Sequence, residues 1–496
     1  MKIRLSMVLV SLAAAALGAC GSGGGSGSMS AGGNGSGAGG GTAVGGTGSS
    51  ATPLTSSGSI SAFGSVYING NHFNITGAQI TLDDDPATEA DLQVGHTATV
   101  TGTAPVGTGL ALATLVAVRS QVVGPVASVN ATGNSFVVLG QTVKLGSETS
   151  FDAAISPGDI TGIQAGDLVA VHGPTASDGS ISARRVSRAT AAMGLRVAGT
   201  VAGVNAAAHT LKLNALTVNY AAANLQGFAG GAPANGDSVR ATGTVFAAAT
   251  TTLTATTVAR TAPPVSSTAA HIIEVEGLVT RFASLTDFDI AGQKVTTTAA
   301  TSYVNGTSAD IALNADVEAH GTLNGSGVLV ATVIDTHNNG LYTLNAPLTA
   351  LNATAGTVTV LGVTATVNAL TRLEDRGASR VRNFAFGDLR IGDNLVVVGY
   401  QKPAGSGQLV ATLLTRLPAS SVVAVTGPFT ATTAPQFRIL GVTVNAASAT
   451  FYADRFATVT AAQFFAQAAG RQVAVTGAGS NPVVATRVML LPVDFN

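Results

Sequence analysis

The chain has 496 residues, of which 46% are hydrophobic and only 10% are charged, and its formal net charge at pH 7 is -1. Its single cysteine excludes a disulfide within the chain, and so small a net charge provides no long-range attraction for nucleic acids or other polyanions. We therefore expect stability to come from buried apolar surface, and we expect no nucleic-acid partner.

The first 20 residues have the pattern of a bacterial lipoprotein signal. Lys2 and Arg4 precede an apolar stretch over residues 7–17, which ends in the run Leu17-Gly18-Ala19-Cys20. The stretch is short for a bilayer span, and the small residues before Cys20 give a peptidase access to the backbone. We therefore expect residues 1–19 to be a signal peptide that is removed, rather than an ordinary secretory signal in which the cysteine is incidental.

Lipidation of Cys20 would determine where in the cell the protein is located. Diacylglycerol on the sulfur and an acyl chain such as palmitate on the new amino group together hold a protein firmly on a membrane. Gly21, instead of an aspartate, follows the cysteine, and this resembles the sorting rule for the outer membrane of Gram-negative cells. We expect a bacterial cell-envelope protein, anchored by lipid in the outer membrane.

Residues 20–57 are expected to form a flexible linker. They consist almost entirely of Gly, Ser, Ala and Thr, which offer too little side-chain surface for a packed core. Gly35, Gly37 and Gly40 match the spacing G-x-G-x-x-G, but a dinucleotide-binding loop needs a strand before it and a helix after it. We expect no cofactor here.

Beyond the linker, one pattern is repeated six times. Each copy begins with a short apolar strand, as in Gly124-Pro125-Val126, continues through a hairpin and a looser loop to a Leu-x-x-Gly-Asp-like turn, as in Leu389-Arg390-Ile391-Gly392-Asp393, and ends in a fifth strand. The predicted repeats are residues 58–119, 124–188, 199–260, 277–335, 346–416 and 427–490.

The repeats predict an all-β protein. Apolar residues alternate with period two, β-branched residues are frequent, and Gly, Asn and Asp interrupt the strands. Five strands with a longer link between the third and the fourth predict six tandem small, partly open barrels of the OB kind. Helices are expected only at Ala461 to Ala469 and around Val381 to Phe386.

These motifs carry a family resemblance. The run Gly58-Ser59-Ile60-Ser61-Ala62-Phe63 and the turn Leu92-Gln93-Val94-Gly95 resemble the opening of envelope lipoproteins built from repeats called domain of unknown function 5666. The resemblance extends over nearly all of residues 58–490 and is strongest in the first, second and fifth repeats. It implies the repeat architecture and no catalytic residue, because the family has no established activity.

An acidic turn is the first candidate site. Asp83, Asp84 and Asp85, with Glu89 and Asp91 nearby, present several oxygens, as a calcium ion requires. Their spacing does not match an EF-hand. We expect a solvated acidic turn and no metal.

Three histidines fall at related positions. His172 and His320 each precede the glycine that ends a fourth strand, and His96 lies near the start of that strand in the first repeat. Neither a His-x-x-x-His pair nor a cysteine partner accompanies them, so we expect ordinary strand-end histidines and no metal site.

Hydrolytic chemistry has one weak candidate. Asp287 and Asp289 lie on one face of a strand, but paired glycosidase carboxylates usually come from separate elements, and a G-x-S-x-G motif is absent from the sequence. We expect no catalytic residue.

Two arginine clusters could suggest binding of nucleic acid by an OB-like barrel. The clusters are Arg184, Arg185 and Arg188, and Arg372, Arg376, Arg380 and Arg382. Aromatic residues make up only 5% of the chain and tryptophan is absent, so the stacking that such binding needs is missing. We expect solvated faces or contacts between repeats.

The favoured function is that of a noncatalytic, lipid-anchored envelope protein that presents a string of β-barrel modules for binding, adhesion or spacing, with an envelope protein or a glycan as partner. The alternative is a carbohydrate-binding or hydrolytic protein with a site between modules, which a pocket holding convergent carboxylates or histidines would favour. A third interpretation joins all strands into one solenoid or an outer-membrane barrel, although the strands lack aromatic girdles.

Overall fold

The computed structural model describes residues 52–63, 65–105, 110–228, 230–261, 271–337, 342–402, 405–453 and 457–491. The predicted signal peptide, Cys20 and most of the predicted linker lie outside the described residues. The end of that linker does not match the structure, because strand β1 begins at Pro53. Leu54 is buried in the core of the first repeat, so this serine-rich segment belongs to the folded body.

The described residues form an all-β protein, as predicted. Repeat one contains β1 (Pro53–Ser59), β2 (Ala62–Phe63), β3 (Val66–Ile68), β4 (Asn71–Asn74), β5 (Gln79–Leu82), β6 (Asp85–Pro86), β7 (Thr97–Thr103) and β8 (Ala111–Val118). Repeat two contains β9 (Val122–Asn130), β10 (Ser135–Val138), β11 (Gln141–Phe151), β12 (Leu168–His172) and β13 (Ile181–Arg188). Repeat three contains β14 (Leu195–Thr200), β15 (Ala202–Asn205), β16 (Thr210–Leu213), β17 (Leu216–Asn219), β18 (Asn224–Gln226), β19 (Ser238–Ala247) and β20 (Thr252–Arg260).

The second half of the chain follows the same plan. Repeat four contains β21 (Ile272–Ser284), β22 (Asp287–Ile290), β23 (Gln293–Thr296), β24 (Ser302–Val304), β25 (Asp316–Leu323) and β26 (Leu329–His337). Repeat five contains β27 (Tyr342–Asn352), β28 (Thr357–Val360), β29 (Val363–Thr366), β30 (Arg372–Asp375), β31 (Asn394–Gln401) and β32 (Leu409–Leu417). Repeat six contains β33 (Val423–Pro428), β34 (Thr430–Ala431), β35 (Gln436–Ile439), β36 (Val442–Asn445), β37 (Thr450–Tyr452), β38 (Thr458–Val459), β39 (Gln472–Ala478) and β40 (Val483–Leu490).

The strands join into three sheets of 14, 12 and 14 strands, and each sheet is shared by two repeats. Repeats two and three are joined where β9 pairs antiparallel with β14, and repeats five and six where β27 pairs antiparallel with β33. Repeats one and four are joined by the parallel pair β1 and β21. The prediction of six separate barrels is therefore wrong on this point, and the continuous ladders are a feature that the solenoid interpretation expected. The first strand of repeat four begins at Ile272 rather than near 277 because its extra residues make this junction.

The hydrophobic cores follow the same pairing. One core runs through repeats two and three, and another through repeats five and six, whereas repeats one and four have separate cores. Repeats one and four are thus joined by strand pairing and by the polar contacts described below, with little shared apolar core. Their junction depends more on hydrogen bonds and ion pairs than the other two junctions do.

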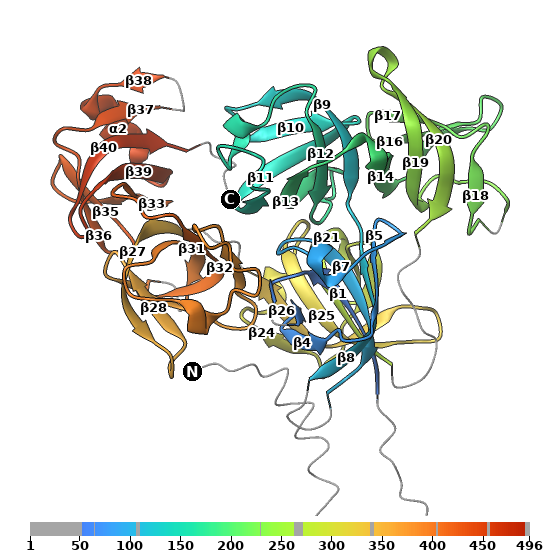
Figure 1. Cartoon of the computed structure of the whole chain (residues 1–496), viewed down its shortest axis with the longest axis horizontal. Helices are drawn as coiled ribbons and strands as arrows, with labels where there is room; N and C mark the ends of the chain where they lie inside the picture. Colours follow the sequence, from blue (N-terminus) through green and yellow to red (C-terminus); the bar gives the residue numbers. More distant parts are fainter. Residues whose placement is uncertain are drawn as a thin grey trace, which may run out of the picture.

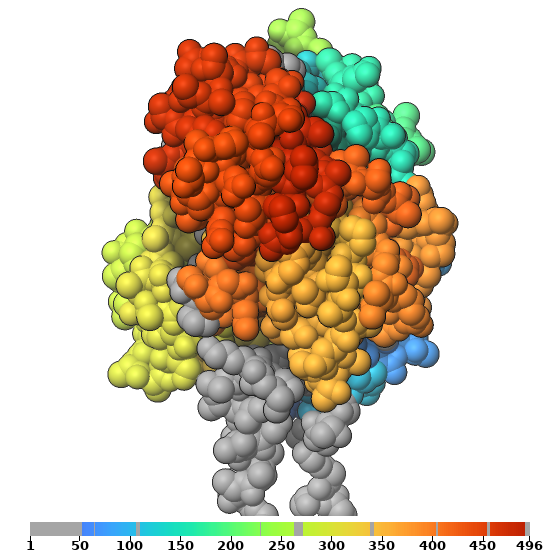
Figure 2. Space-filling view, turned by 90° about the vertical axis from the view of Figure 1, so that its left-hand side faces the viewer, coloured from blue at the N-terminus to red at the C-terminus, as the bar shows by residue number. Residues whose placement is uncertain are grey.

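The repeats do not form an extended string. In Figure 1, repeats one, two and four lie around the middle of the molecule, repeat three (green) lies at one end, and repeats five and six (orange and red) lie at the other. Repeats one and five touch directly, since the Leu373 N–H donates to the Ser61 carbonyl over 2.8 Å. Figure 2 shows repeat six (red) directly against the orange surface of repeat five, to which the pair of β27 and β33 joins it. The predicted string is folded back on itself.

The helix prediction is confirmed at one of its two positions. In the described part of the chain the one α-helix is α2 (Ala461–Ala468), where the Thr460 side chain caps the N-terminus and Phe464 packs among the aromatic rings of repeat six. The second expected helix is absent: the segment holds only η6 (Phe386–Asp388). The other 3-10 turns are η1 (Glu89–Asp91), η2 (Ile160–Gly162), η3 (Ala191–Met193), η4 (Ala248–Thr250) and η5 (Ser308–Asp310).

A glycine near the end of the fourth strand recurs in all six repeats. At each of these positions a Cβ atom would come within 2.3 Å or less of a carbonyl oxygen of the fifth strand. At five of the six, the ladder between the fourth and fifth strands also shifts register at the glycine. The glycines are Gly102, Gly173, Gly243, Gly321, Gly399 and Gly477.

This close approach predicts the effect of Gly399→Ala. Because the added methyl would lie 2.3 Å from the Val410 carbonyl oxygen, the two strands must separate, and we expect the free energy of unfolding to fall by about 1–3 kcal/mol. Chemical denaturation measures the change. Gly387→Ala is the matched control, since no atom lies within 4 Å of the position that its methyl group would occupy, and it should change stability by less than about 0.5 kcal/mol. Equal effects of both substitutions would contradict the argument.

Candidate metal centre between the repeats

The outer face of repeat four carries an unusual concentration of charge. Along β25, Asp316, Glu318 and His320 alternate with Val317 and Ala319, which lie in the core. Because successive side chains of a strand point to opposite faces, the three polar residues share the outer face. The register places Glu274 of β21 opposite His320, and His337 of β26 opposite Asp316. Three neighbouring strands therefore present carboxylates and imidazoles to the same side.

Three other repeats cover this face. From repeat one, the Asn71 side chain donates to Glu274 over 2.5 Å, and the Ser59 N–H donates to Glu276 Oε2 over 2.9 Å. From repeat two, Arg184 forms an ion pair with Asp316 and another, at 3.2 Å, with Glu148 of its own repeat. From repeat five, Arg372 pairs with Glu148 at 3.3 Å. The charged face is therefore buried at a junction of four repeats.

The first group of potential ligands is Glu274, Glu318 and His320. His320 uses both ring nitrogens: Nδ1 lies 3.2 Å from Glu274 Oε1, and Nε2 lies 2.7 Å from Glu318 Oε1. Burial opposes protonation of His320, but the two carboxylates outweigh it and raise its pKa well above the usual value. The geometry is that of an imidazolium held between two carboxylates.

The second group is Glu276, Asp316 and His337, and its atoms are more widely spaced. His337 Nδ1 lies 4.0 Å from both Glu276 Oε1 and Asp316 Oδ1, which is too far for a hydrogen bond. Asp316 Oδ1 and His337 Nε2 are buried and have no hydrogen-bond partner. Burial opposes protonation of His337, but the nearby Glu318 carboxylate and the charges of Asp316, Asp335 and Glu276 together outweigh it and raise its pKa to about 10.

A cavity of about 70 Å³ adjoins the second group. Glu276, Asp316 and His337 line one side of it, and Asn69, Arg372 and Tyr400 come from repeats one and five. A water molecule needs roughly 10–15 Å³, so several fit, but pockets for drug-sized ligands measure about 300–1,000 Å³. The cavity suits water or a small ion.

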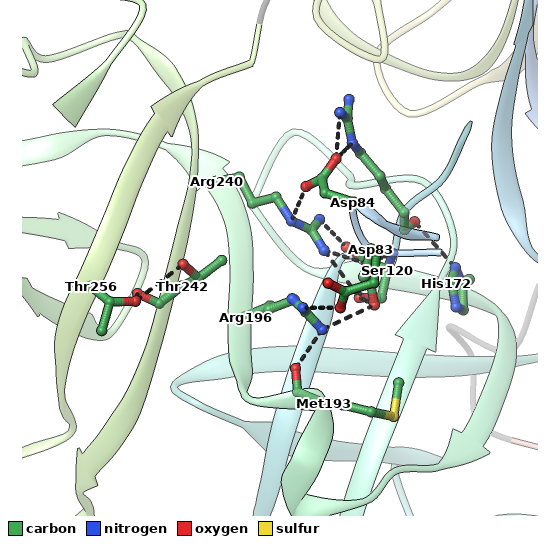
Figure 3. Close-up of polar contacts among 11 residues, drawn as sticks. Asp83, Asp84, Ser120, His172, Met193, Arg196, Arg240, Thr242 and Thr256 are labelled. Carbon is green, nitrogen blue, oxygen red and sulfur yellow. Dashed lines mark hydrogen bonds and ion pairs between the residues drawn. The ribbon is translucent and has the colours of Figure 1, made fainter. Parts of the chain in front are cut away.

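The acidic turn of repeat one lies elsewhere and makes a second junction (Figure 3). Asp83 is only 3% exposed, forms an ion pair with Arg240 of repeat three, and accepts hydrogen bonds of 2.8 and 2.9 Å from Ser120. Burial opposes ionisation of Asp83, but Arg240, His172 and the hydrogen bonds from Ser120 together outweigh it and lower the carboxyl pKa. The prediction of a solvated turn is therefore wrong for Asp83, because repeats two and three cover it.

The other residues of the turn are more exposed. Asp84 and Asp85 pair with Arg119 at 2.7 Å and with Arg196 at 3.0 Å. Asp91 accepts hydrogen bonds from the Thr88 N–H and hydroxyl, and these bonds lower the pKa of its carboxyl group. Glu89 and Asp91 are the first and last residues of the turn η1, which Thr88 precedes. The carboxylates therefore serve turns and ion pairs, and the structure does not gather them around one point.

The histidines of repeats one and two meet. The rings of His96 and His172 lie with their centres 4.4 Å apart and their planes tilted by 34°, and both residues are buried. Burial is the main cause that lowers the pKa of both, to about 4 in His172, although Asp83 opposes it there. The expectation of ordinary strand-end histidines missed this contact between repeats.

The remaining candidates are accounted for by arginine pairs. Asp287 and Asp289 both bind Arg281, at 2.5 and 2.8 Å, in an exposed cluster on repeat four. Arg184, Arg185 and Arg372 are buried, and their contacts with other repeats agree with the second of the two interpretations given for the arginine clusters. Arg382 likewise reaches repeat one, where it lies over the Phe63 ring and donates to the Ala90 carbonyl.

Sequence reasoning missed the second ligand group entirely. Glu276, Asp316 and His337 lie far apart in the sequence, and nothing in it shows that other repeats cover them. A signal was present nonetheless: the segment Asp316-Val317-Glu318-Ala319-His320 alternates charged and apolar residues in a chain with few charges. Such a strand has a polar outer face. Three side chains of metal-ligand type on one short strand indicate a candidate site.

None of the helices in the described part of the chain has the length and apolar character of a membrane span. A search of curated proteins finds no match. The family model described as "Domain of unknown function (DUF5666)" matches residues 123–187, 276–335, 346–414 and 426–489, which are repeats two, four, five and six. Repeat one, where we expected one of the strongest resemblances, is not among the matched regions. Since the matches cover just over half of the chain, the protein belongs to the DUF5666 family.

Proposed function

We propose that the protein is a noncatalytic, lipid-anchored protein of the bacterial cell envelope, held in the outer membrane through Cys20. Its repeats form one body that binds an envelope protein or a glycan, or that spaces such partners from the membrane. The observation that carries the proposal is the junction of four repeats, where buried ion pairs such as Arg184 with Asp316 and Arg372 with Glu148 occupy most of the charged side chains. Charges used in this way hold the repeats together.

We also propose that each repeat is an OB-like unit within its two-repeat sheet. In repeat five, for example, β27 pairs with β28, β28 with β29, β29 with β32, β32 with β31, and β31 with β27. This order returns to the strand at which it began, with one parallel pair, and supports the proposal of an OB-like unit. An OB-like fold does not by itself identify a ligand.

The alternative, a ligand-binding or hydrolytic protein with a site between modules, has one observation in its favour. The cavity at the junction contains convergent carboxylates and an imidazole from different elements, as that alternative requires. Its volume of about 70 Å³ is small for a sugar, and Arg184 neutralises one of the carboxylates. Noncatalytic binding is therefore the better proposal.

The anchor is tested by Cys20→Ser. Because serine cannot receive the thioether-linked lipid, we expect the variant to leave the membrane fraction and to become soluble in the periplasm or the medium, while the wild-type protein partitions into detergent. Fractionation with immunoblotting and mass spectrometry of the N-terminus measures this. Ser22→Ala is the control and should stay in the membrane. A Cys20→Ser variant that remains detergent-bound would contradict the proposed anchor.

The partner is tested with the soluble Cys20→Ser chain. Immobilised protein is incubated with detergent extract of the envelope, and a glycan array is probed in parallel. Saturable retention of one protein or glycan supports a binding role. Hydrolysis of an arrayed glycan or of an envelope polymer would overturn the noncatalytic assignment.

A further inference from the structure

The two groups of ligand-type side chains on repeat four differ in a way that assigns them different roles. In the first, His320 Nδ1 lies 3.2 Å from Glu274 Oε1 and His320 Nε2 lies 2.7 Å from Glu318 Oε1, so each ring nitrogen contacts a carboxylate directly. In the second, His337 Nδ1 lies 4.0 Å from Glu276 Oε1 and from Asp316 Oδ1, too far for hydrogen bonds, and one ligand atom from each of the three residues lies within 4.8 Å of the others, close enough for one ion to touch all three. We infer that Glu276, Asp316 and His337 bind a divalent transition-metal ion, with zinc as the best fit.

Each of the two carboxylates is held by its outer oxygen, and its inner oxygen faces the group. Glu276 accepts the Ser59 N–H at Oε2, and its Oε1 faces the group. Asp316 Oδ2 is bound by Arg184, whereas Oδ1 is buried and has no hydrogen-bond partner. An unsatisfied buried carboxylate oxygen is unfavourable unless a cation compensates it.

The imidazole is oriented in the manner of a metal ligand. His337 directs Nδ1 toward Glu276 and Asp316, and its Nε2 lies 3.5 Å from Glu318 Oε2 on the opposite side. Metal-binding histidines usually have a carboxylate or carbonyl group behind the second nitrogen, which fixes the ring and its tautomer. Glu318 is placed for this positioning role.

The donor set identifies the class of ion. One imidazole nitrogen and two carboxylate oxygens suit zinc and neighbouring transition metals, whereas calcium takes six or more oxygens. Tetrahedral zinc with bonds of about 2.0–2.1 Å separates its ligands by about 3.4 Å, so the present spacing closes by roughly 0.6 Å on binding. The three residues line the cavity, which leaves a fourth coordination position for water or a small anion.

The test uses the full chain in detergent after treatment with a chelator and dialysis. Zinc chloride is titrated by calorimetry and by competition with a chromophoric chelator, and one ion per chain is expected to bind. His337→Gln and Glu276→Gln should each weaken binding about 100-fold or more, and Glu318→Gln about 10- to 100-fold. Glutamine at position 276 keeps one oxygen for the Ser59 N–H, so this variant preserves the contact between repeats.

His320→Gln is the matched control. His320 lies on the same face as His337, is also buried and also contacts Glu318. The His320→Gln variant should nevertheless keep its zinc affinity within a few-fold of the wild-type value. Circular dichroism checks the fold of each variant, and anomalous diffraction at the zinc edge locates the ion independently of any variant. Absence of stoichiometric zinc binding, equal loss in His320→Gln and His337→Gln, or an anomalous peak away from the three residues would overturn the proposal.

Discussion

Replacing Asp83 by asparagine is expected to lower the free energy of unfolding by about 3–5 kcal/mol, because it removes the nearer of the two carboxylates that pair with the buried Arg240 and leaves only Asp84, at 3.9 Å. Arg240 is 5% exposed, and its guanidinium also donates to the Ser120 carbonyl over 2.7 Å. An asparagine keeps the shape of the turn and one acceptor oxygen, so the change isolates the charge. Most of this loss of stability should come from weaker contacts at the junction of repeat one with repeats two and three.

Thermal unfolding of the variant, with hydrogen exchange resolved by repeat, measures this effect. We expect faster exchange at Ser120 and in β5, β6 and β19, which surround the pair. Asp85→Asn is the matched control in the same turn, since its side chain is 75% exposed and pairs with Arg196 at the surface. Surface pairs contribute about 0–1 kcal/mol, so equal losses in both variants would refute a special role for Asp83.

Stability should also fall as the pH decreases from about 6.5 to about 4, because two buried histidines at the junction of repeats one and two must then bind protons. Burial lowers the pKa of His172 to about 4 and that of His96 well below its usual value. In this pH range the unfolded chain binds more protons than the folded chain, so protonation favours unfolding. The contribution is complete above the unfolded pKa near 6.5 and is lost on acidification.

The surroundings of the pair determine the size of this effect. Asp83 favours the protonated form of His172, whereas Arg185 and Arg240 oppose it, and the His172 Nδ1 lies 3.1 Å from the Arg119 carbonyl oxygen. At about 1.4 kcal/mol per pKa unit, the lowered pKa of His172 corresponds to roughly 3 kcal/mol between neutral pH and pH 4. This loss is comparable to that expected for Asp83→Asn.

Denaturation curves between pH 4 and pH 7.5 test the prediction. His172→Gln removes one titrating group and should flatten the slope of stability against pH in the acidic range, even if it lowers stability at neutral pH. His209→Gln, at an exposed turn of repeat three, serves as the control and should keep the wild-type slope. An unchanged slope in His172→Gln would show that other groups cause the acid sensitivity.

Local patterns in the sequence predicted the strands well because a strand depends on its own alternation of residues. The run Val358-Thr359-Val360-Leu361-Gly362-Val363 is a hairpin in both the prediction and the structure, and Ala461 to Ala468 forms the expected helix. The sequence predicts that residues 53–57 belong to the linker, because serine and threonine dominate this segment. Its strand character comes from pairing with β7 and with β21, which lies far away in the chain.

The candidate site could not be predicted for a related reason. Burial of Asp83 depends on Arg240, and burial of Asp316 depends on Arg184, so each assignment needs the arrangement of whole repeats. A surface carboxylate and a carboxylate covered by another repeat look alike in sequence. Beside the alternation of charged and apolar residues from Asp316 to His320, the arginine clusters are a usable hint, because contact between repeats is one of the two interpretations given for them.

The parallel pairing of β1 with β21 constrains the order in which the protein can fold. Ser59 and Glu276, which meet beside this pair, are 217 residues apart, so repeats two and three must be synthesised before repeat one acquires its neighbour. Long-range parallel pairing is slow to form, and an unpaired strand edge is prone to aggregation. During vectorial synthesis or export, β1 therefore remains an open edge until repeat four emerges, and a chaperone that shields this edge would raise the yield of the native protein.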